Sequence, residues 1–289
     1  MDRLQRLEVF VAVAEAESFV GGARRLGLSA LEERLGARVF TRTSRRVRLT
    51  YVGKAYLEDT RHILAQLQVA DDATVGAATN PVGELRLNCS NEFGRIYVTP
   101  ILMDFLNTYP DVSADVVMVD RVVNMVEEGF DVAVRIGSLP SSGLAAVRVG
   151  RVRRIVCGAP SYFRQQGFPQ VPADLTHHRI VAAAPVSPVT EWRFGRDLST
   201  GIQLKPRLRL SSIAAAISVA RQGWGLTRVL SYQVGPDLLD GTLQTVLEDY
   251  EPEPLPIHLV HAEGRRAPAK VRTFIDFAKQ RLRAESALH

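Results

Sequence analysis

Residues 18–50 constrain the fold of this chain most, because they follow a helix, glycine and helix pattern and end in an arginine-rich segment. Ser18 is a suitable N-cap for a short helix over residues 18–26, since its hydroxyl can accept from an unpaired backbone N–H. Gly27 is expected to end that helix, and Ser29 to cap a second helix over residues 29–35. Two short helices joined by a glycine turn predict a helix-turn-helix, which places its second helix in a DNA groove.

Residues 38–48 carry five arginines interleaved with threonine and serine, and strand-forming residues flank them. We expect a small basic hairpin, a wing. Guanidinium forks and short hydroxyls suit phosphate oxygens. An ordinary solvated arginine face is the alternative, but beside a helix-turn-helix the pattern favours DNA. The residues expected to contact DNA are Ser18, Arg24, Arg25, Ser29, Thr41, Arg42, Thr43, Arg45, Arg46 and Arg48.

The net charge of +5 is concentrated at one end of the chain. Residues 1–54 hold 11 Lys and Arg against 6 Asp and Glu, whereas the remaining residues hold 25 of each. The excess positive charge therefore lies wholly in the segment expected to bind DNA, as an electrostatic footprint should.

Composition limits the class of protein. With 289 residues, 46% of them hydrophobic and 23% charged, the chain is globular and long enough for about two domains. No apolar run is long enough to span a membrane and the N-terminus does not resemble a signal peptide, so we expect a cytoplasmic protein. Cys89 and Cys157 are expected to be buried thiols, and His177 and His178 surface residues rather than metal ligands. We find no catalytic motif, and expect neither an enzyme nor a cofactor.

Two helices frame the N-terminal part. Residues 2–16 have apolar positions at helical spacing and predict an amphipathic helix. Thr50 is expected to cap a long helix that runs to about Ala78, with a weak heptad seam. Such a helix favours pairing with a second chain, because two DNA half-sites need a two-fold protein. A helix packed on its own domain is the alternative. Residues 76–83 read as a hinge.

From Glu84 onward strands and helices alternate, which predicts an α/β domain with helices on a mostly parallel sheet. We expect two subdomains, joined near residues 151–155 and again near 256–261. The expected strands lie at residues 85–89, 112–119, 131–136, 147–149, 155–157, 179–183, 191–194, 202–210, 225–229 and 255–261. The expected helices lie at residues 96–109, 122–128, 213–222 and 268–284.

The N-terminal pattern resembles that of LysR-type transcriptional regulators. It is carried by Leu4, Phe10, Ala14, Ser18-Phe19, Ala23, Leu26, Ser29, Leu31-Glu32, Leu35-Gly36, Phe40, Arg42 and Leu49-Thr50-x-x-Gly53. The resemblance implies that Ser29 opens the recognition helix and that the long helix dimerises.

The chain departs from that family between Ser29 and Leu31. In the family about nine residues, or two and a half helical turns, separate the serine from the Leu-Glu pair. Here only Ala30 does. Two explanations are open: a true deletion, or a segment that the printed sequence omits. A true deletion would give the alternative function, a dimerising ligand-binding protein with impaired DNA recognition.

The C-terminal part resembles the effector domain of the same family, which has the periplasmic binding-protein fold. The matching segments are GELRLN, FLNTYPDV, EEGFDVAVRIG, VGRVRRIVCGAPSYF and ARQGWGL. Leu226-Thr227-Arg228 departs from it, since the family usually has small apolar residues there. The resemblance implies promoter DNA, a small effector and a homodimer or homotetramer, with RNA polymerase as a further partner. The implied domains are a winged helix-turn-helix at 1–52, a linker helix and hinge at 53–80, and an effector domain at 81–289. Its subdomains would be 84–155 with 258–289, and 156–257.

Polar residues follow several predicted strands. Ligands of open α/β sheets bind beyond the carboxyl ends of the strands, and a helix N-terminus there favours an anion such as a carboxylate. A plain helix cap is the alternative for each serine, and an ion pair with Asp131 or Glu128 is the alternative for Arg135. The expected effector contacts are Ser90, Asn91, Glu92, Asp120, Arg135, Ile136, Gly137, Ser211, Ser212 and Thr227.

Overall fold

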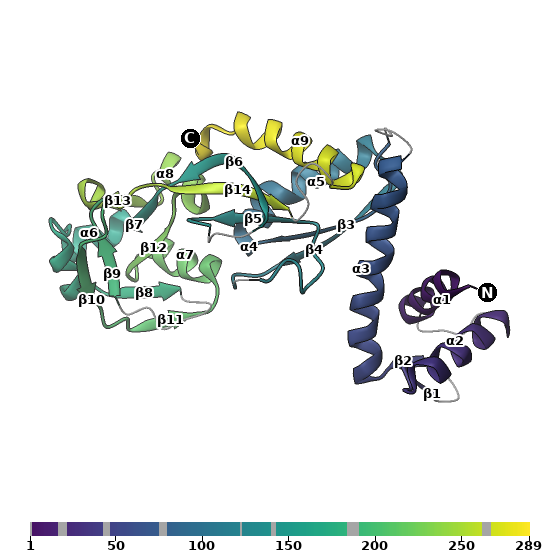
Figure 1. Ribbon diagram of the computed structural model, residues 1–289. Coiled ribbons are helices and arrows are strands. Elements are labelled where there is room, and N and C mark those ends of the chain that lie inside the picture. Colours follow the sequence, from purple (N-terminus) through teal and green to yellow (C-terminus); the bar gives the residue numbers. More distant parts are fainter. Residues whose placement is uncertain are drawn as a thin grey trace. The chain divides into compact units, whose positions relative to one another are not determined.

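The computed structural model describes residues 2–16, 22–42, 47–74, 80–121, 123–139, 143–183, 191–261 and 267–289 (Figure 1). The chain forms two compact units. Unit 1 comprises residues 1–79 with short pieces at 126–129 and 266–269, and unit 2 comprises the rest. Within the described residues, no helix has the length and apolar character needed to cross a lipid bilayer.

Unit 1 begins with the amphipathic helix that the sequence predicted. Helix α1 (Arg3–Ala16) is preceded by Asp2, whose Oδ1 accepts from the N–H of Gln5 at 2.8 Å while Gln5 Oε1 accepts from Asp2 N at 3.1 Å. This reciprocal pair is a capping box. Phe10 and Val13 are buried on the inner face of the helix.

The helices predicted at residues 18–26 and 29–35, with a turn at Gly27, are wrong in their bounds, because α2 (Gly22–Leu35) is one continuous helix. Gly27 lies inside it, and Ser29 is an exposed interior position rather than a cap. With a single residue between Ser29 and Leu31, Leu28 and Leu31 fall three apart and are both buried on one face. The helix ends instead at Gly36, which adopts a φ of +63°.

The predicted wing and long helix are confirmed. Strands β1 (Phe40–Arg42) and β2 (Val47–Leu49) form an antiparallel hairpin. Helix α3 (Tyr51–Thr74) is 24 residues long, about 36 Å. Thr50 caps it, since its Oγ1 accepts from Gly53 N at 2.9 Å and donates to the carbonyl of Arg38 at 2.8 Å. Residues 75–78 of the predicted helix lie outside the described residues. Ile63, on the predicted heptad seam, is 48% exposed.

Unit 2 contains two five-stranded mixed sheets (Figure 1). The first has the order β4-β3-β5-β14-β6, with β3 (Gly83–Cys89), β4 (Val112–Met118), β5 (Val132–Ile136), β6 (Ala145–Val152) and β14 (Leu255–His261). The second has the order β11-β8-β12-β7-β13, with β7 (Arg154–Gly158), β8 (Ile180–Ala183), β11 (Leu208–Leu210), β12 (Leu226–Leu230) and β13 (Gln244–Val246). Strands β9 (Glu191–Phe194) and β10 (Thr200–Gln203) pair separately.

The expected mostly parallel sheet is wrong, since each five-stranded sheet has two parallel and two antiparallel pairings. Every antiparallel pairing in these sheets involves β7 or β14. The chain enters the second sheet through β7 and returns to the first through β14, so these two strands run against their neighbours.

The helices of unit 2 differ from the prediction in two places. A helical segment already begins with α4 (Asn91–Phe93) and continues through a π-helical stretch (Gly94–Val98) into α5 (Thr99–Thr108), five residues earlier than predicted. The prediction of a short helix at residues 122–128 is wrong for residues 123–128, which the structure describes as non-helical. A turn occupies residues 125–129, closed by Gly129 at a φ of +67°. The other helices are α6 (Pro160–Gln166), α7 (Ile213–Arg221), α8 (Gly235–Leu239) and α9 (Ala269–Ala284).

The strand predicted at 202–210 is split into β10 and β11. Pro206 lies between them, and a proline has no N–H to donate to a strand ladder.

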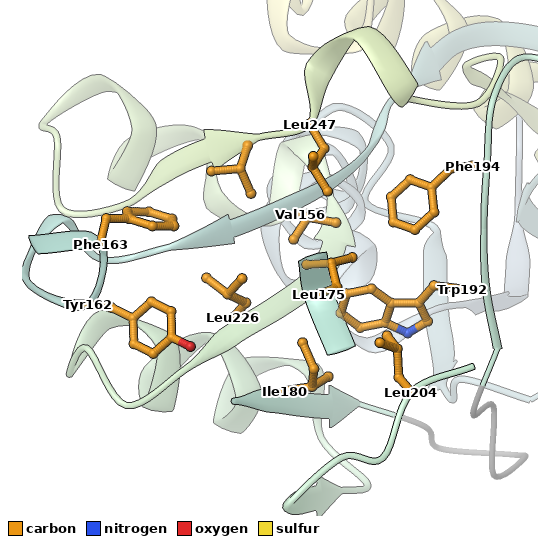
Figure 2. Close-up of a cluster of buried hydrophobic side chains, with 11 residues drawn as sticks. Val156, Tyr162, Phe163, Leu175, Ile180, Trp192, Phe194, Leu204, Leu226 and Leu247 are labelled. Atoms are coloured by element: carbon orange, nitrogen blue, oxygen red, sulfur yellow. The ribbon is translucent and has the colours of Figure 1, made fainter. Parts of the chain in front are cut away.

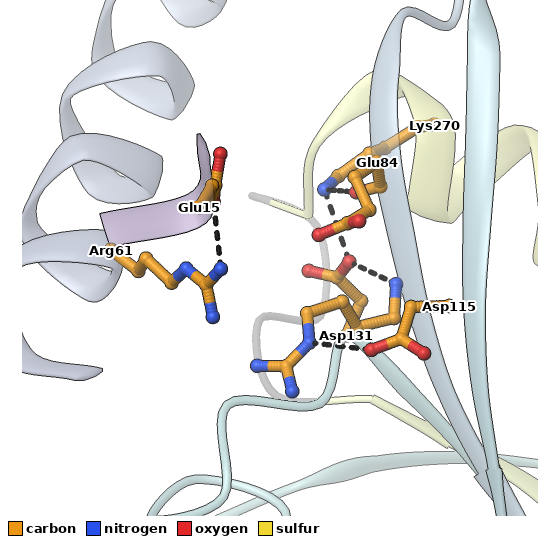
Figure 3. Close-up of polar contacts among 7 residues, drawn as sticks. Glu15, Arg61, Glu84, Asp115, Asp131 and Lys270 are labelled. Carbon is orange, nitrogen blue, oxygen red and sulfur yellow. Dashed lines mark hydrogen bonds and ion pairs between the residues drawn. The ribbon is translucent and has the colours of Figure 1, made fainter. Parts of the chain in front are cut away.

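Side-chain contacts fix these elements within each unit. An apolar cluster that includes Val156, Tyr162, Trp192 and Leu226 packs on one face of the second sheet (Figure 2). Lys270 of α9 lies 3.0 Å from Asp131 and also donates to the carbonyl of Glu84 (Figure 3). In unit 1, Arg61 of α3 pairs with Glu15 of α1 at 2.6 Å (Figure 3).

Candidate ligand cavity and nucleic-acid interface

A cavity of about 730 Å³ lies in unit 2, lined by residues of both five-stranded sheets. This volume falls in the range of small-molecule sites. Four of the ten predicted effector residues line it: Ser90, Asp120, Arg135 and Ile136. They follow β3 and β4 or end β5, where parallel strands bring their carboxyl ends to one edge.

The first wall is held in place by side-chain hydrogen bonds. Asp120 accepts from the backbone N–H of Asn91 at 3.0 Å and from its side-chain amide at 2.8 Å. Asn91 therefore orients Asp120 without lining the cavity itself. Ser90 Oγ is buried, and its nearest polar neighbour is the hydroxyl of Tyr232, which also lines the cavity.

Two neutral groups hold the side chain of Arg135. One guanidinium nitrogen donates to Asn88 Oδ1 at 2.7 Å, and another donates to the carbonyl of Val123 at 2.8 Å. Asp131, one of the ion-pair partners considered for it, bonds to the N–H of Arg86 at 2.9 Å and to Lys270. The side chain of Arg135 thus lines the cavity from a fixed position.

Six predicted effector residues do not line this cavity: Asn91, Glu92, Gly137, Ser211, Ser212 and Thr227. Glu92 is buried and pairs with Arg95 at 2.8 Å. Ser212 accepts from Ala215 N at 3.3 Å and is a plain cap of α7, while Ser211 is exposed. Gly137 donates its N–H to the carbonyl of Pro256.

Thr227 and Arg228 face opposite sides of β12. Thr227 is fully buried, and its Oγ1 donates to the carbonyl of Val181 at 3.1 Å. Arg228, the next residue, lines the cavity. Successive strand residues alternate between faces, so the residue that faces the cavity is Arg228, one position after the predicted Thr227. Alternation along residues 226–230 was the signal that could have identified Arg228.

The environment of Arg228 is unusual for a cation. Its guanidinium lies 5.0 Å from the ring centre of Phe194 and 5.7 Å from that of Trp192, and one nitrogen donates to the carbonyl of Arg193. Its Nε is buried with no hydrogen-bond partner among the described residues. Burial, with a smaller contribution from the charge of Arg154, lowers the pKa of Arg228 to about 10.

The cavity is strongly basic. The described residues that line it include five arginines, at positions 121, 135, 154, 193 and 228, against the two carboxylates of Asp120 and Glu191. Glu191 already pairs with Arg193 at 3.1 Å. Of these arginines, only Arg135 was predicted from the sequence. Trp192, Tyr232 and Gln233 also line the cavity and were not predicted.

Both cysteines are buried in unit 2. Burial raises the pKa of both Cys89 and Cys157 to about 12, so these thiols remain protonated at neutral pH. Among the described residues, no group of three or more His, Cys, Asp or Glu could hold a metal ion. His178, expected at the surface, is half-buried, and its Nδ1 lies 3.1 Å from the Tyr162 hydroxyl.

The wing presents two of the predicted DNA contacts. Thr41 and Arg48 are directly paired across the hairpin, both are exposed, and Thr41 Oγ1 donates to the carbonyl of Arg48 at 3.1 Å. Ser29 is exposed on α2. Arg24 and Arg25 lie in α2 and Arg42 ends β1, but their side chains are outside the described part. Ser18, Thr43, Arg45 and Arg46 lie outside the described residues.

Two family models together match almost the whole chain. The model described as bacterial regulatory helix-turn-helix protein, lysR family, matches residues 4–54. The model described as LysR substrate binding domain matches residues 78–283.

Individual relatives agree with these matches. An uncharacterized HTH-type transcriptional regulator of Escherichia coli, YhjC, is 30% identical over 96% of this chain and 97% of its own length. An HTH-type transcriptional regulator of Xanthomonas campestris is 32% identical over 95% of this chain and 84% of its own. The solved structure of CrgA, a LysR-type regulator from Neisseria meningitidis, has a TM-score of 0.64 at 24% identity, over 98% of this chain and 99% of that chain. A probable transcriptional regulator from Pseudomonas aeruginosa has a TM-score of 0.70 at 17% identity, over 97% of each chain.

Proposed function

Because the chain belongs to the LysR family of transcriptional regulators, we propose that the cavity of unit 2 is its effector site and that the wing of unit 1 contacts the DNA backbone. The family assignment makes the chain a DNA-binding transcriptional regulator with an effector-binding domain. The main support for this effector site is the cavity itself. It brings Ser90, Asp120, Arg135 and Ile136 together with residues of the second sheet.

The wing supports the assignment of phosphate contacts. Thr41 and Arg48 offer a hydroxyl and a guanidinium side by side on an exposed hairpin. Such groups bond to phosphate oxygens and set the register of a protein on DNA without reading sequence. We extend the same role to Arg42, Thr43, Arg45 and Arg46 from their positions in the sequence. Ser18, Arg24, Arg25 and Ser29 are proposed to contact DNA from the helical part.

The domains and assembly are proposed in the same terms. Residues 1–52 would bind DNA, 53–80 would pair two chains through α3, and 81–289 would bind the effector. Ile63 and Leu67 of α3 support pairing, because both belong to the predicted heptad seam and both are exposed. A homodimer or homotetramer would hold paired half-sites and act on RNA polymerase, and the cavity would bind its effector without chemical change.

Impaired DNA recognition, the alternative considered for the short segment after Ser29, is not favoured. The family's helix-turn-helix model matches residues 4–54 and so extends across this segment.

The test is selection of genomic DNA fragments by the full-length protein, followed by sequencing. We expect the recovered fragments to share a two-fold symmetric motif, and the protein to bind a fragment with that motif at least about a hundredfold more tightly than a scrambled duplex. Even recovery of fragments across the genome would contradict sequence-specific regulation and restore the alternative.

A further inference from the structure

We infer that the cavity binds an organic anion with an apolar body, and that the acid group of this ligand contacts the guanidinium groups of Arg228 and Arg154. This inference rests on the proposed effector site and specifies its ligand class.

The two arginines project from one face of the second sheet. Strands β12 and β7 are antiparallel, and their register pairs Arg228 with Val156 and Leu230 with Arg154. Directly paired residues share a face, as do residues two apart along a strand. Arg228 and Arg154 are therefore diagonal neighbours, and both line the cavity.

These two charges lack a neutralising partner among the described residues. None of the ion pairs of the described residues joins a carboxylate to Arg228 or Arg154. Burial lowers the pKa of both, and the charge of Arg154 also lowers the pKa of Arg228. Buried charges are normally paired, so a ligand that brings a negative charge would relieve this arrangement.

Hydrogen-bonding capacity points the same way. Arg228 uses one nitrogen on the carbonyl of Arg193, while its buried Nε has no hydrogen-bond partner among the described residues. A guanidinium can donate two parallel hydrogen bonds to a carboxylate or phosphate. Glu191 cannot serve as a free counter-charge, because it is held by Arg193.

The remaining lining residues of the cavity indicate that the ligand has an apolar part beside its acid group. Aliphatic side chains are their most numerous class, and a small inorganic anion would leave them facing water. An amine would meet an excess of like charge, and a neutral isostere would leave the guanidinium charges uncompensated. The aliphatic residues of the lining include Val119, Val134, Ala182, Ile213 and Leu255.

The experiment uses the full-length protein and matched probes with three bodies: cyclohexane, benzene and a linear hexyl chain. Each body is supplied as the carboxylate, the neutral amide and the primary amine, and binding is followed by tryptophan fluorescence, since Trp192 lines the cavity. We expect at least one carboxylate to bind, with an affinity at least about tenfold above that of its amide. We expect no binding of its amine.

Variants locate the binding group. Arg228→Met and Arg154→Met should each weaken carboxylate binding at least about tenfold, whereas Arg228→Lys, which keeps the charge but loses the fork, should fall between them and wild type. Arg209→Met, at an exposed position on β11, is the matched control and should bind like wild type. Urea unfolding followed by tryptophan fluorescence checks the fold of each variant. A free energy of unfolding equal to or above that of wild type shows that the variant remains folded.

Several outcomes would overturn the inference: no carboxylate binds, an amide binds as tightly as its carboxylate, or Arg228→Met keeps full affinity. The proposed function fails separately, by the genomic selection. If the protein selects a DNA motif and a neutral amide changes that binding while no carboxylate does, the effector site stands and the anionic ligand does not.

Discussion

At the scale of single residues, the Tyr162 hydroxyl joins two neighbouring segments of unit 2. Its oxygen accepts from the backbone N–H of Arg179 at 2.9 Å, and it lies 3.1 Å from His178 Nδ1. Because the Tyr162 oxygen accepts from Arg179, its proton is free to be donated to an unprotonated His178 Nδ1. Burial lowers the pKa of His178, Asp174 opposes this effect, and His177 adds to it.

This arrangement predicts a pH dependence of stability. Below the unfolded-state pKa of about 6.5, the unfolded chain takes up a proton that folded His178 resists. The free energy of unfolding of unit 2 should therefore fall as the pH is lowered from about 7 to about 5. His178→Asn keeps an acceptor for Tyr162 and removes the titrating group, so it should flatten this fall.

Urea unfolding followed by tryptophan fluorescence at a series of pH values measures the effect. Both tryptophans of the chain, Trp192 and Trp224, lie in unit 2. Part of the slope should survive in the variant, because burial also lowers the pKa of His258. Identical pH profiles for wild type and variant would show that His178 is not responsible.

The candidate site was partly predictable at this scale. Ser90, Asp120, Arg135 and Ile136 line the cavity because they stand at strand ends, which hydrophobic alternation reveals. Alternation along its strand separates Arg228 from Thr227, but only the register with neighbouring strands shows which of the two faces meets the cavity, so Arg228 was not predicted. Ser212 shows the opposite error, because a local cap of α7 has the same sequence pattern as an anion site.

At the scale of elements, α2 shows how two local signals compete. Gly27 carries a stop signal and so does Gly36, but the helix ends at Gly36. The buried positions Leu28 and Leu31 continue one helical face past Gly27, and packing against Phe10 and Val13 outweighs the local signal. Helix interiors tolerate a glycine at a cost of about 0.5–1 kcal/mol relative to alanine.

Two matched substitutions test this reading. Gly27→Ala should raise the free energy of unfolding of unit 1 by about 0.5–1 kcal/mol, because alanine is the better residue inside a helix. Gly36→Ala should lower it by about 1 kcal/mol, because φ at Gly36 is +63°.

Far-UV circular dichroism during urea unfolding measures both, while tryptophan fluorescence should stay unchanged as the internal control for unit 2. Destabilisation by Gly27→Ala would mean that Gly27 ends a helix, as the helix-turn-helix pattern had suggested.

At the scale of the whole molecule, the order of elements was predictable and the direction of some strands was not. Alternating strands and helices after Glu84 gave the α/β class, and the matches of β9 and β14 to their predicted bounds show how strong that pattern is. The antiparallel placement of β7 and β14 depends on how the chain passes between two sheets. Local sequence carries no signal for that path.

The charge distribution of the whole chain leads to the last prediction. Since the net charge of +5 lies in residues 1–54 and the remaining residues are balanced, the salt dependence of DNA binding should arise from unit 1. Arg48→Gln should reduce the slope of log affinity against log salt concentration by about 1 for each Arg48 that contacts a phosphate. Its effect on affinity should be similar for the selected motif and for a scrambled duplex, because phosphate contacts carry no sequence information.

Arg209→Gln is the matched control, since it removes the same charge from an exposed strand position in unit 2. Fluorescence anisotropy of a labelled duplex at several KCl concentrations gives both slopes. A wing contact requires that Arg48→Gln lower the slope and Arg209→Gln leave it unchanged. Equal reductions of the slope in the two variants would mean that the salt dependence follows only the total charge of the chain. The role assigned to the wing would then be wrong.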